Sequence, residues 1–491
     1  MEKHFPSYGN RYWMDVATLL RATGNPTGIP RTVAMLLGGL LANRAVNLRL
    51  CWFHSRLRNF TEVVIRDYGR EDLKNHAPGR AAGNNGRPRS GTPRKAVSAT
   101  QAGPEWLLKL YYSLPYDFRP AASSLYRLTL TARGWIKLRS ALEWAVASFN
   151  WLKQLAPWTK TDPLLRLDSL VRVRKRSKRL QLRPSDVVIS AGRPWAEPIY
   201  PGAVGDLRRS AGFKLVSFVY DVIAVKFPQF VRPDFPPVFR QWFIETLRCS
   251  DLIVTISENS RRDILALANE TATPAPQVVV IRLGDDIPTG GGVRGEWEGF
   301  SPFERYVLSV GTLEVRKNHL LLYQVWRRLI ETHGSLIPKL VIAGQDGWLA
   351  GDLLFQVRND PLTRDRILVL PSVSDEELVW LYQNCLLTAF PSFYEGWGLP
   401  VAESLCHGKY CIASNSSSVP EIAGDLIDYH DPYSFEQCLG LTTRALFDER
   451  FRAEREAAIR ARYRPYSWAQ CADSLLTILA NHFANPSPPA D

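Results

Sequence analysis

The stretch LLTAFPSFYEGWGLPVAESLCHG, residues 386–408, decides how this chain folds. An apolar run ends at Pro391, a loop with two glycines follows, and Pro400 stands where a helix would begin. Proline suits the first position of a helix, because its fixed φ and its missing N–H cost nothing there. Gly408 suits the end of that helix, since glycine readily adopts a positive φ. The pattern predicts a buried strand, a glycine loop and a short helix.

This loop is predicted to bind an anion. Gly396 and Gly398 let the backbone approach a ligand, and the free N–H groups of a helix N-terminus attract phosphate. Glu395 in the loop and Glu403 in the first helical turn have seven residues between them. One carboxylate can therefore face a bound sugar while the other meets a ribose. The alternative is structural, with Glu403 complementing the helix dipole and Glu395 lying on the surface.

Short apolar runs alternate with helical patterns on both sides of this stretch, as YVLSVG, KLVIAG, RILVLP and YCIAS, and earlier as DVVIS, KLVSFVYDVIAV, DLIVTIS and QVVVIRL. Such alternation predicts parallel strands joined by crossover helices. A chain of 491 residues is too long for one ordinary core. We therefore predict an α/β protein with two doubly wound parallel-sheet domains, residues 1–295 and 296–465. A helix and tail at 466–491 would cross back to the first domain.

Near the start, residues 15–20 are interpreted as a strand end, 23–30 as a loop, 31–41 as a helix and 47–53 as the next strand. The segment SVGTLEVRKNHLLLYQVWRRL provides a second phosphate candidate. Arg316 and Lys317 precede a helix that Asn318 can cap. A guanidinium fork beside an ammonium suits a diphosphate leaving group, although such a pair is usually only surface charge.

The segment EGWGLPVAES resembles the E-x7-E signature of the retaining glycosyltransferases of family four, the glycosyl transferases group 1. The similarity is clear over residues 305–435 and weaker over the first domain. It implies the GT-B fold, in which two Rossmann-like domains face a central cleft. It also implies transfer of a hexose, with mannose from GDP-mannose as one candidate, with retention of configuration and without a covalent intermediate. The resemblance leaves the sugar, the base and the linkage open.

The resemblance also assigns residues. Glu395, Arg316, Lys317 and Asp221 would form the catalytic group, with Glu395 orienting the sugar. The donor would be held by Gly311, Thr312, Gly344, Val373, Gly396, Trp397, Gly398, Leu399 and Glu403, the last of these on the ribose. Many members carry Arg directly after the glycine where this chain has Thr312, so Arg316 would bind the diphosphate in its place. The first-domain loop would contribute Gly28 and Arg31, and Glu421 is a weaker candidate whose alternative role is helix capping.

No cofactor beyond the nucleotide-sugar co-substrate is expected. No Asp-x-Asp motif follows a strand, so we predict that no metal ion is essential. The expected acceptor is a glycan or a polyprenyl-diphosphate-linked glycan of bacterial surface or exopolysaccharide biosynthesis. Two alternatives stay open: a sugar-nucleotide 2-epimerase of the same architecture, and a non-catalytic basic protein that binds sugar nucleotides.

The net charge of +13 is uneven, since residues 1–300 hold 44 Lys and Arg against 25 Asp and Glu, while residues 301–491 hold 17 against 23. The segment 74–104 has many Gly and Pro and no acid, so it is interpreted as a flexible basic insertion. The densest basic run, 172–179, is either a solvated edge or a patch for an anionic membrane surface. No nucleic-acid motif accompanies it, so nucleic acid is not an expected partner.

Seven scattered cysteines without a Cys-x-x-Cys pair argue for a reducing compartment. Cys406, His407 and Cys411 lie close in sequence, but no second ligand pair follows, so they are interpreted as small buried residues. The first residues lack an apolar leader, and the run 33–42 is too short to span a bilayer. The expected location is cytoplasmic, peripheral on the inner face of the cytoplasmic membrane.

Overall fold

The computed structural model describes residues 11–21, 28–43, 46–66, 172–197, 199–287 and 304–484, together with residues 295, 297 and 300. All of them fall within one of the chain's two structural units, Met1–Ala77 with Asp168–Asp491. The predicted insertion at 74–104 lies outside the described residues, as do most residues from 288 to 303, around the predicted domain boundary. The domain boundaries therefore stay predictions.

The N-terminal sheet has eight strands in the order β4-β3-β2-β1-β5-β6-β7-β8. Its strands are β1 (Arg11–Asp15), β2 (Leu48–His54), β3 (Asn59–Arg66), β4 (Arg172–Arg179), β5 (Asp186–Ser190), β6 (Lys214–Phe218), β7 (Leu252–Thr255) and β8 (Gln277–Val280). The pairs β2–β3 and β3–β4 are antiparallel, and the other neighbours are parallel. The order of connection reverses between β1 and β5, and such a switch point leaves a crevice at the carboxyl ends of the strands.

The C-terminal sheet has six parallel strands in the order β11-β10-β9-β12-β13-β14. They are β9 (Tyr306–Val310), β10 (Lys339–Ala343), β11 (Ile367–Leu370), β12 (Leu387–Phe390), β13 (Cys411–Ser414) and β14 (Asp428–His430). Its switch point lies between β9 and β12. The predicted α/β class with two parallel sheets is confirmed, and the antiparallel pairs at one edge of the N-terminal sheet are the addition that the alternation did not predict.

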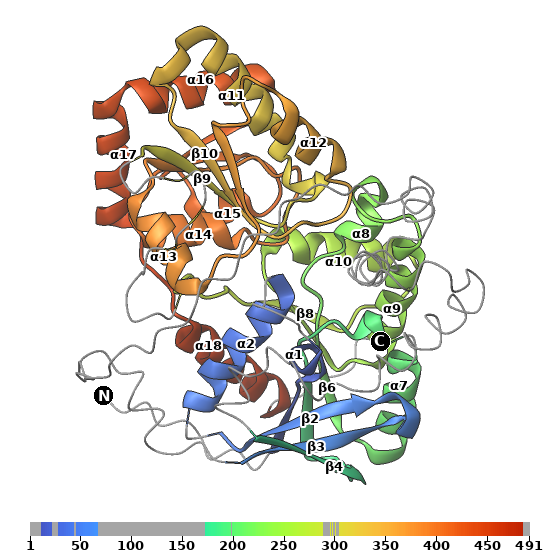
Figure 1. Ribbon diagram of the computed structural model, residues 1–491. Coiled ribbons are helices and arrows are strands. Elements are labelled where there is room, and N and C mark those ends of the chain that lie inside the picture. The colour runs from blue at the N-terminus through green and yellow to red at the C-terminus, as the bar shows by residue number, and fades with distance from the viewer. Residues whose placement is uncertain are drawn as a thin grey trace, which may run out of the picture. The chain divides into compact units, whose positions relative to one another are not determined.

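Helices follow most of the strands (Figure 1). They are α1 (Ala17–Leu20), α2 (Gly28–Ala42), α7 (Tyr200–Ala211), α8 (Ile223–Lys226), α9 (Phe235–Cys249), α10 (Glu258–Glu270), α11 (His319–His333), α12 (Gly351–Asn359), α13 (Asp375–Asn384), α14 (Leu399–Cys406), α15 (Val419–Ala423), α16 (Phe435–Phe447), α17 (Glu449–Arg462) and α18 (Trp468–Ala484). Short 3-10 turns are η1 (Ser55–Leu57), η4 (Pro194–Ala196), η5 (Pro228–Phe230), η6 (Val315–Lys317) and η7 (Gly334–Leu336). None of the described helices is both long and apolar enough to cross a bilayer.

Two predicted elements near the start differ from the structure. Residues 15–20 are not a strand end, because β1 stops at Asp15 and α1 follows it. The Asp15 carboxylate accepts the N–H of Ala17 at 3.0 Å, and this contact turns the chain directly into the helix. The predicted loop 23–30 ends early, since α2 already begins at Gly28, whose φ is 55°.

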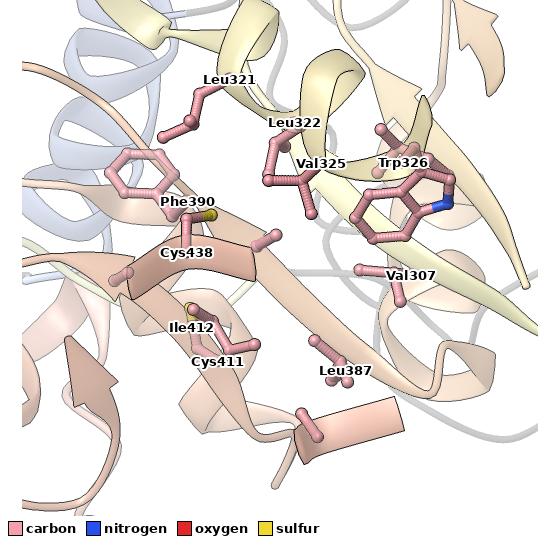
Figure 2. Packing of buried hydrophobic residues seen from close by; sticks show 14 of the residues in the cluster. Val307, Leu321, Leu322, Val325, Trp326, Leu387, Phe390, Cys411, Ile412 and Cys438 are labelled. Atoms are coloured by element: carbon pink, nitrogen blue, oxygen red, sulfur yellow. The ribbon is translucent and has the colours of Figure 1, made fainter. Parts of the chain in front are cut away.

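The core of the C-terminal sheet forms where α11 covers β9, β12 and β13. Figure 2 shows Leu322, Val325 and Trp326 of α11 beside the strand residues Val307 and Leu387, and all five are buried. Each such apolar side chain stabilises the fold by roughly 1.5–3 kcal/mol when it leaves water. This packing fixes the start of α11, and with it the charged turn η6, relative to the ends of the strands.

The terminal helix α18 packs against α2 beside the N-terminal sheet (Figure 1). Its buried residues Trp468, Leu475 and Leu479 belong to the same cluster as Met14 of β1. The approach is close, because a Cβ added at Gly39 of α2 would lie 2.6 Å from the carbonyl oxygen of Trp468. The N-terminal core is therefore completed by residues from the far end of the described chain.

Candidate active site

Two loops meet at the switch point of the C-terminal sheet. The turn η6 follows β9 and presents Arg316 and Lys317, and the loop after β12 presents Glu395. Arg316 Nη1 lies 2.6 Å from Glu395 Oε2, and Lys317 Nζ lies 2.7 Å from Glu395 Oε1. The structure thus brings together three of the predicted catalytic residues. Because parallel strands bind ligands at such a switch point, the position suits a ligand site.

The Glu395 carboxylate is a buried anion between two cations. Burial alone would raise the pKa of Glu395, but Arg316 and Lys317 outweigh it and lower this pKa to about 2. Arg316 also pairs with Glu314 at 2.6 Å and donates to the carbonyl of Tyr394 at 2.8 Å. Lys317 has one carboxylate partner. The ammonium is therefore the less committed of the two cations.

The helix start after η6 differs from the prediction. Asn318 occupies the N-cap position of α11, but its side chain makes no cap hydrogen bond. Instead its Nδ2 donates to the carbonyls of Pro391 and Pro432 at 3.1 and 2.9 Å. These bonds tie η6 to the loops that follow β12 and β14. The left-handed φ of 57° is tolerated because asparagine adopts this conformation more readily than most residues.

The backbone of the glycine loop is well placed for an anion. Gly398, with a φ of 128°, forms the N-cap of α14. The N–H groups of residues 396–399 have no acceptor within the described part of the chain. Free donors at a helix N-terminus favour phosphate oxygens. Gly408, with a φ of 68°, lies just beyond the helix, as its predicted role as helix stop requires.

Three consecutive serines hold this loop in shape. Ser416 Oγ donates to the carbonyl of Phe393, and Ser418 Oγ donates to the carbonyls of Glu395 and Trp397. Ser417 Oγ accepts the N–H of Glu395 at 2.8 Å. The serine hydroxyls therefore satisfy the loop's inner backbone groups and position the carboxylate of Glu395.

Asp221 follows β6 and lies close to the glycine loop. A Cβ added at Gly396 would be 3.1 Å from Asp221 Oδ2. Burial raises the pKa of Asp221, and Arg316 opposes that shift. Ser260 Oγ also donates to the carbonyl of Gly396 at 3.2 Å. The loop of the C-terminal sheet thus contacts residues that belong to the N-terminal sheet and its helices.

The predicted donor-binding glycines lie where backbones approach each other. A Cβ at Gly344 would be 1.9 Å from the carbonyl oxygen of Gly311, and a Cβ at the nearby Gly347 would be 2.8 Å from the carbonyl oxygen of Leu313. Glycine is therefore required at these positions first because a larger side chain would clash with the end of the neighbouring strand. Val373 follows β11 and is half-buried. The strands β10 and β9 separate β11 from the switch point.

Glu403 lies after the first turn of α14, one turn further in than predicted, and is buried. Its Oε1 is 2.9 Å from Arg31 Nη1, and the hydroxyl of Tyr382 donates to its Oε2 at 2.8 Å. Arg31 also lies 3.7 Å from Asp375. Two predicted residues, Arg31 and Glu403, are thus partners. Gly28, at the start of α2, has open space around its Cα.

The side chain of Trp397 is buried away from the charged group. It belongs to the same cluster as Phe218 and Tyr220, and Leu399 packs against that cluster. Any contact of these two residues with a donor would therefore come from their backbone. Glu421 accepts the N–H groups of Glu258 and Asn259 at 2.8 and 2.7 Å, so it caps α10.

Sequence reasoning missed two neighbours of this site. Tyr382 lies on α13 and could have been found only from the fold. His319, next to Lys317, is buried and its Nδ1 has no hydrogen-bond partner among the described residues. Burial and Lys317 lower the pKa of His319 to about 3, so the imidazole is neutral.

The thiols near the end of α14 form no metal centre. Within the described ranges, no group of three or more His, Cys, Asp and Glu side chains converges on one point. Cys411 is buried in β13, and Cys406 is half-buried at the end of α14. The sequence interpretation of these residues as packing residues agrees with these positions.

Residues 298–457 match the family model described as glycosyl transferases group 1. The chain is 29% identical over 269 residues to O-antigen chain mannosyltransferase B of Escherichia coli, which covers 52% of this chain and 68% of that protein. It is 24% identical over 243 residues to the serotype-specific mannosyltransferase WbdA of Escherichia coli, covering 48% of this chain. The chain spans about two thirds of the first relative and 30% of the second.

A solved structure with a similar fold is sucrose-phosphate synthase from Thermosynechococcus elongatus. The match has a TM-score of 0.53 at 16% sequence identity and covers 96% of this chain and 98% of that chain. At this identity the likeness concerns the fold alone. It extends over both sheets.

Proposed function

We propose that this chain, which has the GT-B fold and whose residues 298–457 match the glycosyl transferases group 1, transfers a hexose from a nucleotide sugar to a glycan acceptor. The observation that carries the proposal is the meeting of Arg316, Lys317 and Glu395 at the switch point of the C-terminal sheet. The free N–H groups of residues 396–399 lie in the same loop as Glu395.

In this proposal the donor diphosphate binds between η6 and the start of α14. Lys317 and the free N–H groups stabilise the negative charge that develops on the leaving group, which is the main source of catalysis in such a site. Arg316 is held by two carboxylates, so its contribution is to position Glu395 and the loop as well as to supply charge.

Glu395 would orient the hexose by accepting its hydroxyl groups. Its low pKa keeps it ionised at neutral pH. We propose retention of configuration through attack on the face from which the diphosphate leaves, with Asp221 near the acceptor and without a covalent enzyme intermediate. Glu403 would bind the ribose while it stays paired with Arg31 and accepts the hydroxyl of Tyr382.

We further propose that no metal ion is needed. In this site Lys317 and the backbone donors would supply the charge that a divalent ion supplies elsewhere. Transfer should then proceed at an unchanged rate in the presence of EDTA. A rate that collapses with EDTA and returns with Mg²⁺ would contradict this part of the proposal.

The acceptor is proposed to be a bacterial surface polysaccharide or its lipid-linked precursor, and the sugar to be mannose. The names of the two Escherichia coli relatives support both choices. The basic strand β4, at the edge of the N-terminal sheet, is the proposed contact with an anionic membrane surface. Sedimentation with anionic and neutral vesicles tests the membrane contact, and equal binding to both would exclude it.

The decisive experiment offers the protein UDP, GDP, dTDP and ADP sugars in a thermal-shift screen and then the stabilising donor with a glycan acceptor. Release of free nucleoside diphosphate together with a longer glycan is the expected result. Isomerisation of the sugar nucleotide without an acceptor would favour the epimerase alternative. Binding of the donor without any consumption would favour a non-catalytic role.

A further inference from the structure

Tyr394 directly precedes Glu395 in the loop after β12, and helices of the N-terminal sheet hold its hydroxyl group. The hydroxyl donates to Asp263 Oδ2 at 2.6 Å and accepts hydrogen bonds from Lys226 Nζ at 2.8 Å and Asn259 Nδ2 at 2.9 Å. A tyrosine hydroxyl has one hydrogen to donate and two lone pairs. All of its hydrogen-bonding capacity is therefore used in this contact, which no step of the proposed transfer requires.

The partners of this hydroxyl come from two helices, α8 and α10. Lys226 ends α8, and its Nζ lies 2.5 Å from Asp263 Oδ1, so this ion pair joins the two helices (Figure 1). The Asp263 carboxylate thus accepts from Lys226 with one oxygen and from Tyr394 with the other. Only 14% of its side-chain surface is exposed. Burial raises the pKa of Tyr394 and Asp263 raises it further, so the hydroxyl keeps the proton that it donates.

Aromatic rings strengthen the same attachment. The ring of Tyr394 lies 4.7 Å from that of Phe227, and the Lys226 ammonium lies over it, 4.8 Å from its centroid. The neighbouring Phe393 stacks on Phe230, with ring centroids 5.3 Å apart and an angle of 10° between the planes. Two successive residues of the loop therefore pack on the end of α8 and on η5.

The segment that carries α8 begins at Asp221, which is proposed to lie near the acceptor. The Asp221 carboxylate accepts the N–H of Ile223 at 3.0 Å, and this bond lies at the start of α8. Asp221 also packs against Gly396 of the glycine loop. The segment therefore contacts the loop twice, through Asp221 at one end and through Lys226 at the other. Two contacts fix the orientation of the loop, whereas one contact alone would let it pivot.

Tyr394 connects this attachment to the charged group of the site. Arg316 donates to the carbonyl oxygen of Tyr394 at 2.8 Å, and the same guanidinium lies 2.6 Å from Glu395. The serines 416–418 bind the inner backbone groups of the loop independently. Loss of the Tyr394 hydroxyl should therefore shift the loop relative to Asp221 without changing the internal shape of the loop.

Resting on the proposed function, we propose that Tyr394 is a positioning residue. Its contact with Lys226 and Asp263 holds Glu395 in place relative to Asp221 and so aligns the bound hexose with the acceptor hydroxyl.

The contact should matter for attack by the acceptor and not for binding of the diphosphate, which Lys317 and the free N–H groups of the loop would still hold. Water needs no such alignment and would compete with the acceptor. In that side reaction the bond between the sugar C1 and the diphosphate oxygen breaks, a bond from C1 to the water oxygen forms, and the proton of the water passes to solvent. Loosening the contact should therefore favour hydrolysis of the donor over transfer.

The test removes the hydroxyl and keeps the ring. The donor is the sugar nucleotide that stabilises the wild-type chain most in the screen of UDP, GDP, dTDP and ADP sugars. Tyr394→Phe should lower kcat for transfer about tenfold, since a misplacement of about 1 Å can slow such a reaction about a hundredfold. The affinity for the free nucleoside diphosphate should not change, and more free hexose should be released for each hexose transferred. Calorimetric titration and chromatography of the products measure these quantities.

Tyr433→Phe is the matched control. The Tyr433 ring lies 5.0 Å from that of Phe393 in the same loop, but its hydroxyl has no partner among the residues that the structure describes. This variant should leave kcat, diphosphate affinity and the share of hydrolysis at their wild-type values.

A second variant removes the other side of the contact. Asp263→Ala should also lower kcat, but it should add nothing in the Tyr394→Phe background, because Asp263 acts through the hydroxyl. Losses that multiply in the double variant would overturn the inference, as would a wild-type kcat in Tyr394→Phe. A parallel fall of diphosphate affinity and melting temperature would also overturn it, because the hydroxyl would then only stabilise the loop. A wild-type chain that transfers no hexose would instead refute the proposed function.

Discussion

Arg31 Nη1 lies 2.9 Å from Glu403 Oε1, and the second oxygen of this carboxylate accepts the hydroxyl of Tyr382 at 2.8 Å. Both oxygens of a residue predicted to bind ribose are therefore engaged within the protein. Glu403 is buried and Arg31 is half-buried, with 4% and 15% of their side-chain surfaces exposed. A charge so enclosed depends on its partner, and this dependence can be measured.

Arg31→Met should lower the free energy of unfolding by about 3 kcal/mol, because it leaves the Glu403 carboxylate buried without a cation. The double variant Arg31→Met/Glu403→Gln should recover most of that loss, since no unpaired charge remains. Urea denaturation at pH 7 measures both. Arg450→Met, which removes the exposed arginine of the Arg450–Glu454 pair on α17, should leave the stability nearly unchanged. A double variant less stable than the single one would contradict the coupling.

Lys317→Ala should reduce kcat by roughly 10²–10³-fold and weaken binding of the free nucleoside diphosphate, as expected for the loss of a preorganised charge. Arg316→Ala should in addition lower the melting temperature, because Glu314 and Glu395 lose their common partner. Steady-state kinetics, calorimetric titration and thermal melts separate the two variants. Equal diphosphate affinity in wild type and Lys317→Ala would remove the ammonium from the donor seat.

Stability should fall as the pH is lowered from 6.5, because of His319. Its pKa is about 3 in the folded chain against 6.5 in the unfolded one, so only the unfolded chain binds a proton between these values. Its contribution is fully present above pH 6.5 and is lost toward pH 3. Glu395 acts in the same direction, but only below about pH 4.5. His319→Gln should therefore reduce the slope of unfolding free energy between pH 6.5 and 5 by up to about 1.4 kcal/mol per pH unit. An unchanged slope would contradict the burial of a neutral imidazole.

Gly284→Ala should destabilise the fold by roughly 1–3 kcal/mol, because the new methyl group would lie 2.6 Å from the Trp468 ring. Gly440→Ala is the matched substitution in α16, where the methyl group meets nothing within 4 Å. It should stabilise the helix by up to about 1 kcal/mol. Denaturation of the two variants side by side is the measurement. Equal effects would mean that α18 does not press on Gly284.

The sequence predicted those features that depend on local patterns. Buried strands are recognisable as apolar runs in the sequence. The strand, loop and helix around Glu395 could be predicted from Pro400 and the neighbouring glycines. The sequence could not predict which distant side chains would meet. The partnership of Arg31 with Glu403 depends on how α2 and α14 lie. The actual role of Asn318 as a tie to Pro391, instead of a helix cap, depends on a loop more than 70 residues away.

The antiparallel pairs β2–β3 and β3–β4 were also missed. The strands β3 and β4 lie more than a hundred residues apart in the sequence, and the charged run 172–179 lacks the apolar alternation that marks a strand. Trp397 was assigned to the donor from its motif, yet its ring completes an apolar cluster with Phe218. A motif identifies the backbone geometry of a loop more reliably than the direction of each side chain.

The docking of α18 on α2 has a consequence for biosynthesis. Trp468, Leu475 and Leu479 fill a core that β1 and α2 open near the start of the described chain. On the ribosome, these early elements emerge long before their partner is translated. We expect the N-terminal sheet to complete its core only after α18 has been translated, so that the last step of its packing is post-translational.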